Sequence, residues 1–186
     1  MSRTLTIKKG GPSPYSEGWH TATISNAEYG EWEGGDGPVK YIDVYFDDYS
    51  DKMNLRVYAK ESKNGEEFAI GKLFRFANAG INDALDDGEG NMVIKMNDSP
   101  EELLGKDVNI FLYKDGEYSK VLKEIAPVPF KNIVEEFNDK DVDFWKDKAL
   151  QYFDKYVKPK LNESEEEHIE EVSGDDLTKM AADMPF

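Results

Sequence analysis

Apolar and polar residues alternate along two segments of the chain, Val39 to Asp47 and Met53 to Lys60. A period of two places successive side chains on opposite faces of a strand, so each segment predicts a strand with one buried face. The apolar positions, which we expect in the core, are Ile42, Val44, Phe46, Met53, Leu55, Val57 and Ala59. Gly18 to Tyr29, which is rich in Thr, predicts a strand before these two.

The spacing of apolar residues changes to three and four between Glu66 and Leu85, which predicts an amphipathic helix. Its apolar stripe is Ile70, Leu73, Phe74, Ala77, Ile81 and Leu85. A short strand is predicted from Asn91 to Met96. Ser99 and Glu102 have the spacing of a capping box, with Pro100 at the first helical position, so one helical turn over 100–104 should end at Gly105.

A hairpin follows, with strands from Asp107 to Lys114 and from Glu117 to Ile125. They are joined by Asp115-Gly116, which suits the positive φ angles of a two-residue turn. Three strands, one helix and two more strands is the order of an OB-fold, a five-stranded Greek-key barrel. The predicted fold is therefore mainly β, with the amphipathic helix between strands three and four.

A second helix is predicted from Asp141 to Val157. Its apolar stripe is Val142, Trp145, Ala149, Tyr152, Phe153 and Tyr156. This stripe is compatible with packing on the barrel and with a homodimer contact. The organisation predicted is a flexible arm over 1–17, an OB-fold domain over 18–130, a helical extension over 131–162 and an acidic disordered tail over 163–186.

The outward face of strands two and three combines aromatic and basic residues. If the apolar positions face the core, the opposite face carries Tyr41, Tyr45, Arg56, Tyr58 and Lys60. Bases stack on aromatic rings and cations neutralise phosphates, so the mixture predicts sequence-tolerant binding of single-stranded nucleic acid. We expect the path to extend over Lys40, Lys63, Lys72 and Arg75.

Trp32 is a further candidate, because Gly30 to Pro38 has the composition of a loop. Loops of an OB-fold contact its ligand, so we expect Trp32 to stack on a base. Purely structural interpretations compete with this one. Strand tyrosines form cross-strand pairs without any ligand, and Arg56 or Lys60 could pair with Asp43 or Asp47.

Composition limits the chemistry available to the chain. It contains no Cys and only two His, His20 and His168, and it has neither a phosphate-binding Gly loop nor a His pair at metal spacing. We therefore predict no enzyme activity, cofactor or metal. Signal and membrane-spanning patterns are absent as well, so a soluble cytoplasmic protein is expected. The net charge of −16 requires that any nucleic-acid site depend on cations gathered locally.

Residues 163–186 hold nine carboxylates and one cation, Lys179, which predicts a solvated tail. The segment ends in Asp183-Met184-Pro185-Phe186. This tip resembles that of single-stranded-DNA-binding proteins, in which acidic residues precede a terminal Pro and Phe. Together with the order of elements and with Leu104-Gly105-Lys106-Asp107-Val108, it resembles phage-encoded single-stranded-DNA-binding proteins of the OB-fold type.

The resemblance implies coating of single-stranded DNA during phage replication, recombination and repair, in the cytoplasm of the host cell. It also implies that polymerase, helicase or primase binds the tail. The residues expected there are Asp175, Asp176, Asp183, Met184, Pro185 and Phe186. Two functions of other classes compete: an acidic DNA mimic that inhibits a DNA-processing partner, and a magnesium-dependent nuclease in which Asp43, Asp47 and Asp48 would cluster.

Overall fold

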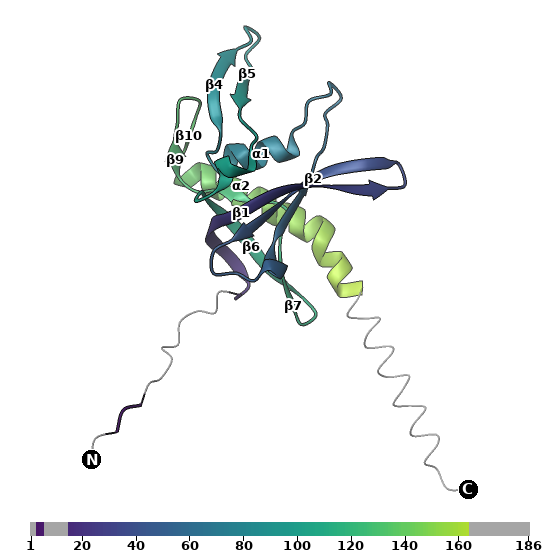
Figure 1. Ribbon diagram of the computed structural model, residues 1–186, viewed down its shortest axis with the longest axis vertical. Coiled ribbons are helices and arrows are strands. Elements are labelled where there is room, and N and C mark those ends of the chain that lie inside the picture. The colour runs from purple at the N-terminus through teal and green to yellow at the C-terminus, as the bar shows by residue number, and fades with distance from the viewer. Residues whose placement is uncertain (1–2, 6–14, 164–186) are drawn as a thin grey trace.

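The chain folds into antiparallel β-sheets accompanied by two α-helices (Figure 1). This computed structural model describes residues 3–5 and 15–163. The predicted mainly β class is confirmed within those residues. The acidic tail beyond Glu163 and most of the N-terminal arm lie outside them. None of the helices in the two described ranges has the length and apolar character needed to cross a membrane.

The longest hairpin joins β1, Gly18–Gly34, to β2, Gly37–Phe46. The prediction that Gly30 to Pro38 forms a loop is wrong, because only Gly35 and Asp36 connect the two strands. The Gly-rich composition reflects a tight turn instead. Strand pairing continues up to Gly34 opposite Gly37, so the hairpin extends well beyond the main sheet, at the right of Figure 1.

The main sheet is completed by three further strands and a short addition. β3, Leu55–Tyr58, pairs with β2; the first part of β1 pairs with β6, Asp107–Asp115, and β6 pairs with β7, Tyr118–Val121. β8, Ala126–Pro127, also joins β6. The path runs β3-β2-β1-β6-β7. In the described chain its end strands do not pair with each other, so a closed barrel is not shown.

The first helix, α1, spans Ala69–Phe76 and is much shorter than predicted. Asn78 and Gly80 have φ angles of 52° and 64°, which a right-handed helix does not allow. The end of the predicted apolar stripe lies on β4, Ile81–Asp86, which forms a separate hairpin with β5, Met92–Met96.

Two 3-10 turns also connect elements: η1, Asp51–Met53, before β3, and η2, Pro100–Leu103, before β6.

Two local predictions near these turns need correction. The capping box at η2 is absent, since Ser99 caps no backbone group and its hydroxyl donates to the Glu101 carboxylate at 2.5 Å. The β6–β7 turn lies one residue later than predicted, at Gly116 and Glu117, because Asp115 still pairs with Tyr118. Gly116 has a φ of 62°, so it supplies the positive φ that the turn needs.

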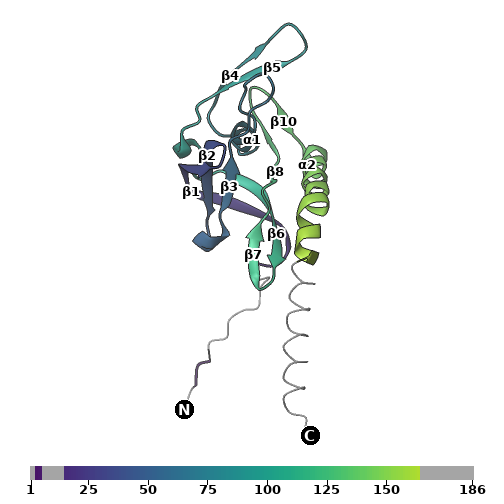
Figure 2. The same cartoon turned by 90° about the vertical axis from the view of Figure 1, so that its right-hand side faces the viewer.

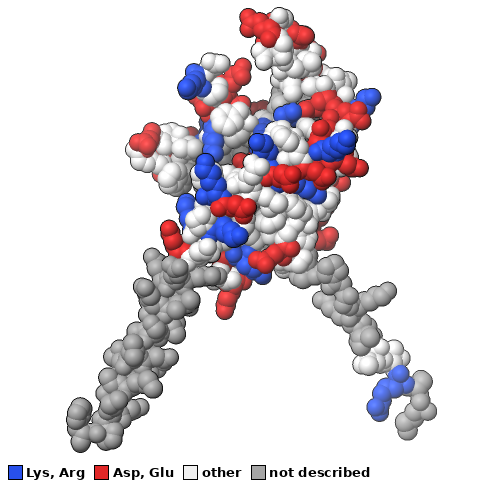
Figure 3. Space-filling view, turned by 180° about the vertical axis from the view of Figure 1, so that it is seen from behind, with Lys and Arg blue, Asp and Glu red and all other residues white. Residues whose placement is uncertain are grey.

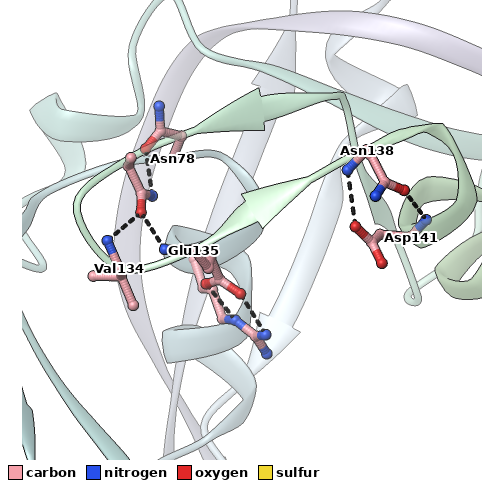
Figure 4. Close-up of polar contacts among 7 residues, drawn as sticks. Asn78, Val134, Glu135, Asn138 and Asp141 are labelled. Atoms are coloured by element: carbon pink, nitrogen blue, oxygen red, sulfur yellow. Dashed lines mark hydrogen bonds and ion pairs between the residues drawn. The ribbon is translucent and has the colours of Figure 1, made fainter.

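The second helix, α2, spans Asp139–Tyr152 and continues into a π-helical turn, η3, Phe153–Val157. It follows a small hairpin of β9, Phe130–Lys131, and β10, Glu136–Phe137. Asn138 and Asp141 form a capping box at its start, drawn at the right of Figure 4. This cap fixes where the helix begins and therefore the direction in which it leaves the hairpin.

The helix α2 packs along one side of the main sheet (Figure 2). The ring of Trp145 lies 4.9 Å from that of Phe76, and the ring of Phe153 lies 5.3 Å from that of Phe111, measured between centroids. The apolar stripe therefore packs on α1 and on β6 of its own chain, which corresponds to one of the two arrangements predicted.

Phe76, on α1, is fully buried, and its ring contacts Phe137 of β10 and Trp145 of α2. We expect Phe76→Ala to lower the free energy of unfolding by about 3–5 kcal/mol, because it removes a buried ring and leaves a cavity. Phe144, on α2, is 52 % exposed. The matched change Phe144→Ala should cost less than about 1 kcal/mol. Urea unfolding of both variants measures the difference, and equal losses would contradict this account of the core.

Candidate nucleic-acid interface

The outward face of β2 and β3 carries the predicted aromatic and basic residues. Tyr41 lies directly opposite Tyr58, and Asp43 lies opposite Arg56. Directly paired side chains share one face of a sheet. The alternating positions on the other face, Ile42, Val44 and Leu55, are buried. The structure thus brings together the outward residues that the alternation predicted.

The guanidinium of Arg56 lies at the centre of this face. Its Nε and Nη2 donate to the two carboxylate oxygens of Asp43, each at 2.7 Å, and Asn54 donates to the same carboxylate at 3.2 Å. The hydrogen bonds from Arg56 to Asp43 raise the pKa of Arg56 above its ordinary value. Its Cζ lies 3.9 Å from the centre of the Tyr41 ring. Arg56 therefore pairs with Asp43, as one structural interpretation predicted, and holds Tyr41 in place.

Two glycines of β1 make room for the large rings. Gly30 pairs with Tyr41, and a Cβ added there would lie 2.4 Å from Cζ of Tyr41. A Cβ added at Gly34 would lie 2.6 Å from Cζ3 of Trp32. Because Gly30, Trp32 and Gly34 are two residues apart, they share one face of β1. Each ring therefore occupies space that a side chain would otherwise fill.

Trp32 lies on a strand, and its predicted place in a loop is wrong. It remains open to a ligand, since 54 % of its surface is exposed. It shares its face of the hairpin with Tyr41, because Trp32 pairs with Val39 and Gly30 with Tyr41. Trp32, Tyr41 and Tyr58 thus form a row across three neighbouring strands, which we call the aromatic row.

Two predicted residues contribute less to this face. Lys40 pairs with Glu31 and, next to Tyr41 in sequence, points to the opposite side of the hairpin. Lys40 therefore does not share the outward face with Tyr41. Tyr45 donates its hydroxyl to Glu28 at 3.2 Å. Burial, followed by this hydrogen bond, raises its pKa.

The cations of α1 are paired rather than available. Lys72 forms an ion pair with Glu124. Glu135, labelled in Figure 4, accepts two hydrogen bonds from Arg75, at 2.7 and 2.8 Å. These contacts fasten α1 to the segments before α2, which gives both cations a structural role. Lys63 is exposed in the turn that precedes α1.

The carboxylates considered for a nuclease do not gather. In the described ranges, no group of three or more His, Asp or Glu side chains is placed to hold a metal ion. Asp43 is committed to Arg56 and Asn54, while Asp47 and Asp48 are exposed beyond the end of β2. The cluster that the nuclease hypothesis required is therefore not formed there.

Sequence reasoning missed a set of residues next to Tyr58. A hollow beside β3 is lined by Tyr58, Lys60, Lys123 and Tyr152, among others. Nζ of Lys123 lies 5.3 Å from the centre of the Tyr58 ring. Tyr152 was assigned to the apolar stripe of the second helix, and Lys123 lies past the end of β7. No local pattern connected them to β3, because the contact depends on how α2 crosses the sheet.

No family model and no curated protein sequence matches this chain. The expected partner-binding residues, Asp175, Asp176, Asp183, Met184, Pro185 and Phe186, lie outside the described residues.

Proposed function

We propose that the protein binds single-stranded DNA on the outward face of β2 and β3, as part of a phage replication and recombination system. The observation that carries the proposal is the aromatic row, Trp32, Tyr41 and Tyr58, with Arg56 beside it. Each base stacked on an aromatic ring contributes about 1–3 kcal/mol, and any base can stack. A row of rings with cations nearby therefore suits a strand of arbitrary sequence.

The proposal includes an OB-like architecture for the main sheet. β1 is long, and its two parts pair with different strands, β6 and β2. A first strand shared in this way, followed by a helix after β3, is compatible with a partly open five-stranded OB barrel. The β4–β5 hairpin would then be an insertion between the helix and the late hairpin.

The proposal also assigns the tail a role in recruiting a polymerase, helicase or primase. Support comes from the sequence, through the acidic run and the final Met184, Pro185 and Phe186. A disordered segment that orders when it binds can offer such a tip to more than one partner.

Trp fluorescence tests the proposed DNA site directly. Of the three Trp residues, Trp19 packs on Phe111 and Trp145 packs on Phe76, whereas Trp32 is exposed. We expect oligothymidine to quench the fluorescence of the parent protein and to have little effect on a Trp32→Phe variant. An equal quench in both would contradict base stacking on Trp32. The absence of any binding by the parent protein, measured by anisotropy of labelled oligothymidine, would contradict the proposed function.

A further inference from the structure

A groove begins at Tyr58 and runs between β3, the β6–β7 hairpin and the helical stretch formed by the end of α2, η3 and residues 158–161. It consists of two adjoining hollows, of about 170 and 640 Å³. Lys60, Lys123 and Tyr152 line both of them. The hollows therefore form one continuous depression, which we call the helix groove. It lies where the end strands β3 and β7 leave the sheet path open.

The helix groove is basic although the protein is acidic. Six cations line it: Arg56, Lys60, Lys72, Lys120, Lys123 and Lys160. Only two carboxylates, Asp115 and Glu124, line it as well. The whole chain has 39 Asp and Glu but only 23 Lys and Arg. The groove therefore has an excess of cations in a chain that has an excess of carboxylates. Figure 3 shows several Lys and Arg side chains along the left of the rear face, with Asp and Glu side chains among them, whereas the tip of the β4–β5 hairpin at the top is mainly acidic.

Some of these cations are already neutralised, and others are not. Arg56, Lys72 and Lys120 form ion pairs with Asp43, Glu124 and Asp115. Lys60, Lys123 and Lys160 form no ion pair with any described residue. All three are exposed. An anion that enters the groove would therefore meet three cations that have no ion-pair partner among residues 3–5 and 15–163.

Aromatic rings alternate with these lysines. Tyr152 and Tyr156 lie with their centroids 5.2 Å apart on successive turns of the helix, and both line the groove. Tyr58 belongs to the aromatic row and also lines the groove, with Lys123 close to its ring. The hydroxyl of Tyr152 can donate to a phosphate oxygen. Burial raises its pKa, which favours the protonated, donating form further. Rings and cations interleaved in this way are the elements of a track for a single strand.

We propose that the helix groove binds a second segment of the same single strand, so that α2 forms part of the nucleic-acid site. The strand would leave the aromatic row at Tyr58 and pass along Lys123 towards Lys160. Its phosphates would pair with the unpaired lysines and its bases would contact the tyrosines. This inference rests on the proposed function, but it assigns binding to a helix that an OB face does not require.

A matched pair of double variants tests the helix groove in the full-length protein. Lys123→Gln with Lys160→Gln removes two groove cations. Lys131→Gln with Lys140→Gln removes two exposed lysines outside the groove and changes the net charge equally. Affinity for labelled oligothymidine is measured from about 0.05 to 1 M salt. Each lysine that neutralises a phosphate contributes about 0.7 to the slope of log K against log salt, so the groove variant should have a slope shallower by about 1.4.

We expect the groove variant and the parent protein to have equal affinities at about 1 M salt. The change of slope then corresponds to a roughly 60-fold lower affinity of the groove variant at about 0.05 M salt. The control should stay within about twofold of the parent protein, since screening weakens distant charges. Substituting Arg at both groove positions should restore binding, because charge rather than lysine packing is required. Unfolding curves establish that every variant is folded.

Three outcomes would contradict the proposal that the helix groove binds the strand. Equal affinities of the groove variant and its control would do so while leaving the proposed function in place, provided that the parent protein binds. Tighter binding by the groove variant would show that the lysines hold an acidic segment that competes with DNA. No binding by the parent protein would remove the proposed function and the groove together.

Discussion

Replacing Tyr58 by Ala is expected to weaken oligothymidine binding by about 1–3 kcal/mol, or roughly 5-fold to 150-fold. The reason is its position: it ends the aromatic row, pairs with Tyr41 at 5.8 Å between centroids, and opens onto the helix groove. A ligand that follows either path meets this ring. Fluorescence anisotropy at fixed salt measures the loss.

The matched control for Tyr58 is Tyr118, which is 75 % exposed next to the β6–β7 turn and lies outside both surfaces. Tyr118→Ala should leave affinity within about twofold of the parent protein, because surface changes away from the site have little effect.

Lys60→Ala should mainly make the salt slope shallower, as expected for a phosphate contact. A further variant has Arg56, Tyr58 and Lys60 all replaced by Ala. If this variant folds and binds oligothymidine as tightly as the parent protein, the proposed site is contradicted.

The sequence predicted the outward face because strand geometry leaves little choice. Once Ile42, Val44 and Leu55 face the core, a period of two places Tyr41, Arg56 and Tyr58 on the other side. The same rule places Lys40 on the opposite side of the hairpin, since it adjoins Tyr41. Short-range periodicity is therefore reliable for relative placement on one sheet.

Element ends were predicted less well, because competing local signals were misread. The apolar stripe of the predicted first helix continues through Ile81 and Leu85, but Asn78 and Gly80 turn the backbone out of the helix. Those two residue types tolerate positive φ more easily than others. The glycines around Trp32 were read as a loop, although two of them make room for rings on a strand.

Contacts between distant segments could not be predicted from periodicity. Arg75 and Glu135 are 60 residues apart, and Lys72 and Glu124 are 52 apart. Both pairs depend on how α1 packs against the segments before α2, and no short sequence pattern predicts that packing. The same is true of the helix groove, whose lysines come from α1, from β7, from the segments that follow β3 and β7, and from the helical residues after η3. Local segregation of this kind is how an acidic chain can present a basic surface.

Deleting residues 174–186 is expected to raise affinity for oligothymidine at about 0.05 M salt and to have no effect at about 1 M. The acidic segment should be attracted to the basic surfaces and compete with DNA. That attraction weakens as salt shortens the Debye length to about 3 Å at the higher concentration. The same deletion should abolish capture of a purified phage polymerase, helicase or primase, because it removes Phe186 and its carboxylate.

A triple substitution and a single substitution separate these effects. Replacing Asp175, Asp176 and Asp183 by Asn keeps the length and the apolar tip, so it should raise low-salt DNA affinity as the deletion does. Phe186→Ala keeps those charges, so it should leave DNA affinity unchanged and still lose the partner, as expected when one aromatic side chain fills a pocket. Equal DNA affinity of the deleted and complete chains at every salt concentration would remove the competition between tail and DNA. Capture of the partner by the deleted chain would remove the docking role independently, because it would place the binding surface on the folded domain.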